Sequence, residues 1–90
     1  MDKTADVSIE YCQVCNFRGR AAWLAQELLA THEAEIAAIA LIPSRGGVLI
    51  VRVDGEIIFS NKDWGRFPEL RELKDALRAK VGLAPAPRHG

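Results

Sequence analysis

The sequence has few residues that could hold a metal ion, with only two cysteines and two histidines among 90 residues. A structural zinc ion usually needs four ligands, taken from two cysteine pairs or from two cysteines and two histidines. His32 follows the helix that we expect after the cysteines and would lie roughly 20–25 Å from them, at 1.5 Å per helical residue. His89 lies in the C-terminal tail. A metal site is therefore a weaker explanation of the two cysteines than a redox role.

The chain also lacks an excess of charge of one sign and a long apolar run. Its 12 Lys and Arg side chains balance 12 Asp and Glu, whereas a surface for nucleic acid or an anionic membrane would show a basic excess. No apolar run approaches the roughly 20 residues of a membrane span, and residues 1–6 have no signal-peptide h-region. We therefore expect a cytoplasmic protein with no nucleic-acid or membrane partner.

Both cysteines stand in one Cys-x-x-Cys motif, Cys12-Gln13-Val14-Cys15. Apolar and polar residues alternate over residues 7–11 and predict a strand, and the apolar spacing of residues 16–30 predicts a helix. We expect residues 12–15 to form the turn and the first helical residues. This placement is typical of a redox motif, because the free N–H groups at a helix start favour the thiolate that attacks disulfides. Inert thiols are the less favoured alternative.

The rest of the chain predicts three more strands and a second helix. Residues 36–42 are a nearly continuous apolar run, short enough for a buried strand. Residues 48–53 and 56–60 flank Asp54-Gly55, a strong signal for a two-residue hairpin turn, which pairs Val51 with Ile58 and Ile50 with Phe59. Residues 61–67 are expected to be a loop, after which a helix opens at residue 68 and ends near residue 82.

The order β-α-β-β-β-α predicts an α/β, thioredoxin-like fold, with a four-stranded mixed sheet and both helices on one face. Residues 1–83 would be a single domain, and residues 84–90 a disordered tail with two prolines. The motif would lie at the C-terminal end of the first strand, where open α/β sheets place their sites. The other sheet face should be bare and apolar, so we expect a homo-oligomer or a partner contact through it.

The cysteine motif and several other segments make the chain similar to a known family. They are Tyr11 to Cys15, Arg20 to Leu29, Pro43-Ser44, Gly46-Gly47, Val53 to Gly55 and Gly65 to Glu69. From about residue 9 to residue 81 the sequence resembles bacterial members of the selenoprotein W-like family, also grouped as SelT/SelW/SelH or Rdx proteins. The resemblance implies a thioredoxin-like fold and a thiol–disulfide oxidoreductase role. The position that is selenocysteine in some members corresponds to Cys15.

We therefore expect a redox-active protein whose catalytic residues are Cys12 and Cys15. The selenocysteine position suggests that Cys15 is the reactive centre. We nevertheless favour Cys12 as the attacking thiol and Cys15 as the resolving one, because the first cysteine of a thioredoxin-like motif usually lies at the exposed end. The partner would be a protein or small-molecule disulfide or thiol. No bound cofactor is needed, and glutathione as a co-substrate, or a reductase, would recycle the pair. The alternative is a non-enzymatic, redox-responsive protein-interaction module.

Side chains near the motif could form a substrate groove. The candidates are Gln13, Val14, Pro43, Ser44, Trp64 and Phe67. Pro43 could stand where thioredoxins place a cis-proline, but an X-Pro bond is cis in only about 5–6% of folded cases, so we favour trans. Trp64 and Phe67 could instead pack the second helix onto the sheet. Arg18 and Arg20 could stabilise a thiolate, although such charges more often form a solvated helix face.

Overall fold

A computed structural model describes residues 4–82 of the chain. Its elements are β1 (Ala5–Cys12), α1 (Arg18–His32), η1 (Glu33–Glu35), β2 (Ile36–Ser44), β3 (Leu49–Val53), β4 (Glu56–Ser60), α2 (Asn61–Trp64) and α3 (Leu70–Lys80). The tail expected over residues 84–90 lies outside the described part of the chain. No helix in the described part is long and apolar enough to cross a membrane.

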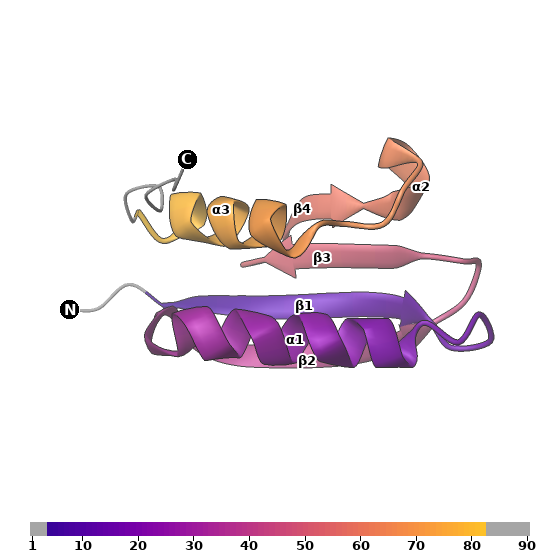
Figure 1. Cartoon of the computed structure of the whole chain (residues 1–90), viewed down its shortest axis with the longest axis horizontal. Helices are drawn as coiled ribbons and strands as arrows, with labels where there is room; N and C mark the ends of the chain where they lie inside the picture. The colour runs from indigo at the N-terminus through magenta and orange to yellow at the C-terminus, as the bar shows by residue number, and fades with distance from the viewer. Residues whose placement is uncertain (1–3, 83–90) are drawn as a thin grey trace.

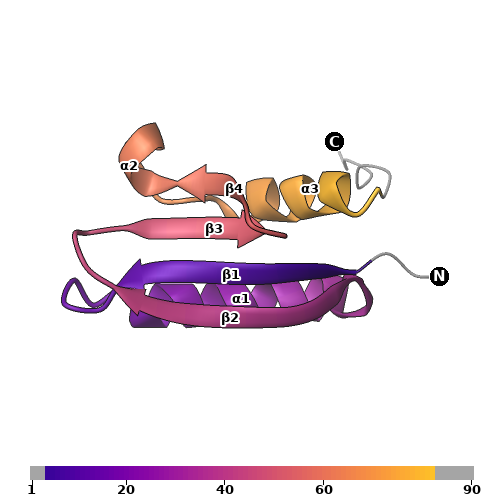
Figure 2. The same ribbon diagram turned by 180° about the vertical axis from the view of Figure 1, so that it is seen from behind.

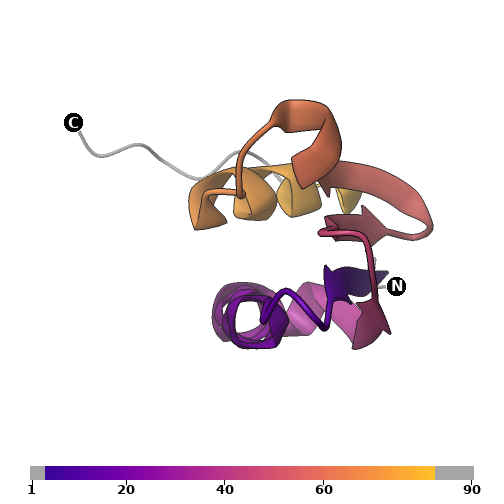
Figure 3. The same ribbon diagram turned by 90° about the vertical axis from the view of Figure 1, so that its right-hand side faces the viewer.

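The four strands form one mixed sheet in the order β2-β1-β3-β4. β1 is parallel to β2 and antiparallel to β3, and β4 is antiparallel to β3. α1 and α3 lie side by side over one face of the sheet (Figure 1), and the strands are uncovered when seen from behind (Figure 2). Figure 3 shows the two layers from the side. The predicted fold class is therefore confirmed.

The core forms between the covered face of the sheet and the two helices. Alternation along β1 turns Val7, Ile9 and Tyr11 inward, and all three are buried. Three- and four-residue spacing does the same along each helix. The buried apolar residues of the two helices are Ala21, Leu24, Ala25 and Leu28 of α1 and Leu73 and Leu77 of α3. Two periodicities in the sequence thus build one continuous core.

The pairing of β3 with β4 corrects the hairpin register predicted from the sequence. The turn has the expected positive φ angles, 51° at Asp54 and 83° at Gly55. Beyond the first two pairs the register shifts, so that Val51 lies opposite Phe59 and Ile50 opposite Ser60. The predicted pairs of Val51 with Ile58 and of Ile50 with Phe59 are therefore wrong. The irregularity turns the Phe59 side chain into the core, where it is fully buried.

Both helices begin later than predicted, and each late start has a local cause. α1 begins at Arg18 rather than at residue 16, because Asn16 has a left-handed φ of 66°. α3 begins at Leu70, where the side chains of Glu69 and Glu72 form a capping box that satisfies free N–H groups. The expected loop over residues 61–67 contains one helical turn, α2.

The open face of the sheet carries a hydrogen-bonded polar cluster, which the sequence prediction of an apolar face missed. Ser44 Oγ donates to Glu10 Oε2 over 2.7 Å, and Arg52 Nη1 donates to Glu10 Oε1 over 2.9 Å. The cluster joins β2, β1 and β3. Ile42 and Ile57 lie beside it in the register of the sheet, exposed by 42% and 50%. The bare face is therefore only partly apolar.

Glu10→Gln is expected to destabilise the fold at neutral pH and to matter less in acid. The hydrogen bonds from Arg52 and Ser44 lower the pKa of Glu10 from its ordinary value of 4.5. A carboxyl whose pKa is lower in the folded state stabilises the fold above its unfolded pKa, and this stabilisation is lost as the pH falls through the folded value. The variant should lose about 1 kcal/mol of unfolding free energy at pH 7.

Urea denaturation of both proteins at pH 7 and at lower pH measures this effect. The difference between wild type and Glu10→Gln should shrink below about pH 4.5, the ordinary pKa. Glu33→Gln is the matched control, because the Glu33 side chain is exposed and has no hydrogen bond within residues 4–82. An equal difference in unfolding free energy between wild type and Glu10→Gln at every pH would show that the charge of Glu10 does not stabilise the fold.

Candidate redox site

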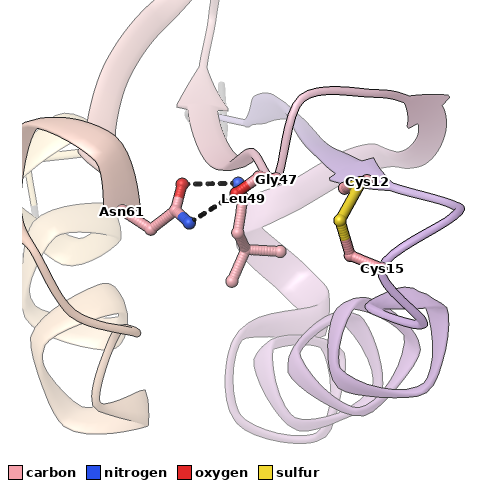
Figure 4. Close-up of a disulfide and its surroundings, with 5 residues drawn as sticks. All are labelled: Cys12, Cys15, Gly47, Leu49 and Asn61. Atoms are coloured by element: carbon pink, nitrogen blue, oxygen red, sulfur yellow. Dashed lines mark hydrogen bonds between the residues drawn. A yellow bond between two sulfur atoms is a disulfide. The ribbon is translucent and has the colours of Figure 1, made fainter.

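Cys12 and Cys15 form a disulfide at the end of β1 (Figure 4). Cys12 is the last residue of the strand, and Cys15 lies in the turn before α1, with the two Cα atoms 5.3 Å apart. The turn is closed by two backbone bonds of 3.3 Å, from the Asn16 N–H to the Gln13 carbonyl and from the Phe17 N–H to the Cys12 carbonyl. The strand-turn-helix placement predicted for the motif is confirmed, but neither cysteine is helical.

The two cysteines differ in their exposure to solvent, in the opposite sense to the one expected. Cys12 is 0% exposed, whereas Cys15 is exposed. The prediction that the first cysteine occupies the exposed end is therefore wrong. The reason is that Cys12 still belongs to β1, which lies between β2 and β3, whereas Cys15 has left the sheet.

The backbone of Cys12 and of the residue after it is fixed by the last residue of β2 and by the loop that joins β2 to β3. The Cys12 N–H donates to the Val48 carbonyl over 2.8 Å, and the Gln13 N–H donates to the Ser44 carbonyl over 3.0 Å. Ser44 also bonds Glu10 through its hydroxyl. The polar cluster on the open face and the start of the cysteine turn therefore share one residue.

Asn61 holds this loop in turn, and sequence reasoning missed it by assigning residue 61 to an unstructured polar loop. Its Nδ2 donates to the Gly47 carbonyl over 2.8 Å, and its Oδ1 accepts from the Leu49 N–H over 2.7 Å (Figure 4). Gly47 and Leu49 flank Val48, which bonds Cys12. The local signal was an Asn that directly follows a strand, but its partners lie 12 and 14 residues away in the sequence.

Asn61→Ala should lower the free energy of unfolding by about 1–3 kcal/mol, because it leaves the Leu49 N–H and the Gly47 carbonyl without their partner. Asn61→Asp keeps the acceptor for the Leu49 N–H but sets a carboxylate oxygen against the Gly47 carbonyl in place of the donor. It should therefore also be less stable than wild type in urea denaturation. Equal stability of all three proteins would contradict a clamping role for Asn61.

A hollow of about 520 Å³ opens beside Cys15. Its walls are Cys15, Asn16, Phe17, Arg20, Trp23 and Phe67. Of the predicted groove residues, only Phe67 lies in this wall. Gln13 and Val14 are exposed in the turn itself, with Val14 75% exposed. Arg20, for which the sequence suggested either thiolate stabilisation or a solvated helix face, lines the hollow directly, and so does Trp23.

The other predicted groove residues lie apart from the hollow. Pro43 and Ser44 end β2, and the peptide bond before Pro43 is trans, as favoured from the sequence. Trp64 packs edge-on against Phe59, with ring centroids 4.5 Å apart, and half of its surface remains exposed. It therefore helps to hold α2 on the sheet, whereas the packing alternative considered from the sequence concerned the second predicted helix, α3.

The end of the molecule that carries the cysteines is rich in positive charge. The segments 13–20, 44–49 and 60–67 contain Arg18, Arg20, Arg45, Lys62 and Arg66 but a single carboxylate, Asp63. The first turn of α1 holds no acidic residue and no side-chain cap. Positive charge and a free helix start both favour a thiolate over a thiol.

The carboxylate of Glu72 forms an ion pair with Arg66. Glu72 accepts a two-pronged contact from Arg66, over 2.6 and 2.9 Å, and this contact lowers the pKa of Glu72. Arg20, in contrast, has no ion pair among residues 4–82. Its guanidinium lies 4.0 Å above the centre of the Phe67 ring. The one charged side chain in the wall of the hollow therefore has no ion-pair partner within residues 4–82.

No cluster of three or more His, Cys, Asp or Glu side chains that could hold a metal ion occurs within the described part of the chain. His32 is buried at the far end of α1, where its Nδ1 lies 3.1 Å from Glu35 Oε1. The site is thus built from sulfur, aromatic rings and arginine.

The chain is similar to a known protein family and to two solved bacterial structures. The family model of the Rdx family matches residues 6–79. The crystal structure of a selenoprotein W-related protein from Vibrio cholerae is 40% identical, with a TM-score of 0.85, and the match covers 88% of this chain and 99% of that one. A protein from Bordetella parapertussis is 37% identical, with a TM-score of 0.84, over 87% of this chain and 99% of that one. No curated protein matches the chain.

Proposed function

The chain belongs to the Rdx family of selenoprotein W-like proteins, and from this membership and its site we propose that it is a thiol–disulfide oxidoreductase. One observation carries the proposal: of two cysteines close enough to form a disulfide, Cys15 opens onto a hollow and Cys12 is sealed in the sheet. An exposed thiol can meet a partner, and a buried one can react only within the protein. This division suits an attacking and a resolving thiol.

In the proposed reaction the reduced protein gives two electrons to a partner disulfide. The Cys15 thiolate attacks one partner sulfur, so that a mixed disulfide forms and the other partner sulfur leaves as a thiolate that takes up a proton. Cys12 then loses its proton and attacks Cys15 Sγ, which releases the second partner thiol and closes the Cys12–Cys15 disulfide. A thiol reductant such as glutathione, or a dithiol reductase, returns the pair to the reduced form. The order reverses the one favoured by thioredoxin logic.

A turnover assay tests the proposal. Wild type should accelerate the reduction of insulin by dithiothreitol, and a Cys12→Ser/Cys15→Ser double variant should leave the rate at that of dithiothreitol alone. Glutathione disulfide is the second substrate to be tested, because the proposed partner is a protein or a small molecule. No turnover with either, although the pair oxidises and is reduced reversibly, would favour a redox-responsive interaction module instead.

We also propose that the chain associates through the open sheet face, with itself or with a partner. Exposed Ile42 and Ile57 support this, and the Glu10 cluster between them limits the apolar area. Sedimentation at roughly tens of micromolar, a concentration suited to weak interfaces, tests self-association. A monomer for both wild type and Ile57→Lys would exclude a homo-oligomer, whereas an oligomer lost in Ile57→Lys would support it.

A further inference from the structure

We propose that the hollow beside Cys15 selects disulfides flanked by a carboxylate and by an aromatic or apolar group, and that Arg20 is the residue that recognises the carboxylate. This inference rests on the function proposed above and adds the class of substrate. Three observations support it: the aromatic wall beside Cys15, the Arg20 guanidinium that stacks on Phe67 without a carboxylate partner among residues 4–82, and a second hollow next to the first.

The walls of the hollow offer flat apolar surface within reach of the sulfur. Phe17 and Phe67 meet edge to face, with ring centroids 5.0 Å apart. Trp23 completes the wall and is 51% exposed. A group attached to the sulfur that Cys15 attacks must enter this space, where aromatic rings favour planar or apolar groups.

Arg20 adds one charged group to these walls. Its guanidinium stacks on the Phe67 ring at 4.0 Å, which fixes its position without using its N–H donors. The other arginines with structural roles are already paired, Arg52 with Glu10 and Arg66 with Glu72. Arg20 has no carboxylate partner within residues 4–82. A planar fork of donors with no partner is suited to a carboxylate of the substrate.

The hollowed surface continues past Phe67, where Lys62 adds a cation with no ion pair among residues 4–82, whereas Arg66 is paired with Glu72. A second hollow of about 370 Å³ is lined by Asn61, Lys62, Gly65, Arg66 and Phe67. Neither hollow has an acidic side chain in its wall, although the chain as a whole has no net charge. The two hollows share Phe67, so an extended acidic segment could cross from Cys15 over this ring, and a small anionic disulfide could use the first hollow alone.

Single-step exchange with the reduced protein, after removal of the reductant, measures the preference without any need for turnover. The peptide probes are two homodisulfides of acetylated, amidated Cys-x-Phe, with Glu or Gln as x. The small probes are 5,5′-dithiobis(2-nitrobenzoate), which is anionic, and 4,4′-dithiodipyridine, which is neutral. Each rate is divided by the rate of the same probe with 2-mercaptoethanol, a neutral thiol, which removes differences in intrinsic reactivity.

Wild type should favour the anionic member of a pair by roughly three- to tenfold at low salt, as expected for one charge pair at a solvated surface. The preference should fall as the salt concentration rises. Arg20→Gln should lose most of it. Arg18→Gln is the matched control, because it removes an exposed charge from the same helical turn at a residue that does not line the hollow.

An equal anionic preference in wild type and Arg20→Gln, or an equal loss in both arginine variants, would overturn the proposal. A preference in the peptide pair points to acidic polypeptide partners, and one confined to the small probes points to small anionic disulfides. Both results support recognition of a carboxylate by Arg20. A protein that shows the preference without turning over insulin or glutathione disulfide would overturn the proposed enzymatic function and leave this recognition intact.

Discussion

Cys15→Ser should abolish the reaction of the protein with disulfides, whereas Cys12→Ser should react once and stop with its partner attached to Cys15. Cys15 is exposed and lines the hollow, so its loss removes the only accessible thiol of the pair. Cys12 is 0% exposed and can reach only Cys15. Without Cys12 the mixed disulfide has no internal thiol to resolve it.

Mass spectrometry after mixing each reduced variant with a model disulfide distinguishes the two roles. Cys12→Ser should carry a stable adduct on Cys15, and Cys15→Ser should carry none. Turnover should fall in both variants by on the order of 1,000-fold. When two residues act as a unit, removing either one alone lowers the rate by about the same factor. An adduct on Cys12 in the Cys15→Ser variant would reverse the proposed order. Far-UV circular dichroism shows whether each variant remains folded.

Phe59→Ala should cost about 3–5 kcal/mol of unfolding free energy, the usual range for an aromatic side chain lost from a core. Phe59 is fully buried, lies opposite Val51 in β3 and packs against the edge of Trp64. Folded domains have only about 5–15 kcal/mol in total, so the variant should be partly unfolded at 37 °C. The loss should also loosen α2, which carries Trp64.

Urea denaturation in one fixed redox state measures this cost. Ile57→Ala is the matched control, because Ile57 lies in the same strand and is 50% exposed. It should cost less than about 1 kcal/mol, as is usual for surface positions. Equal costs for the two variants would show that Phe59 is not the core residue of β4.

The same strand shows where sequence reasoning succeeded and where it failed. Strand and helix positions followed from apolar periodicity, and the Asp54-Gly55 turn set the first pairs of the hairpin correctly. Ile57, Ile58 and Phe59 are three consecutive apolar residues, so period two allows either of two registers beyond the turn. Burial of the largest side chain selects one of them, and that choice depends on the helices across the core.

The site was predictable to a similar extent. The motif and its place at the end of a strand could be derived from local spacing, because strand, turn and helix are consecutive in the chain. The exposure of each sulfur depends on neighbours distant in sequence, since Cys12 is enclosed by strands on both sides. The Asn61 clamp and the wall formed by Phe67 depend on the same kind of contact. The sequence places Asn61 directly after a strand and marks Phe67 as a groove candidate, but it does not identify the residues that either one contacts.

The central position of β1 also affects how the protein is made. β1 is translated before the other strands of the sheet, so both strands that flank it, β2 and β3, are made later. Until residue 53 at the end of β3 has emerged, Cys12 belongs to an unfinished nascent chain in which neither sulfur is shielded. The thiol that is best protected in the finished protein is thus as open to oxidants as its partner during synthesis, and completion of the sheet first makes the two different.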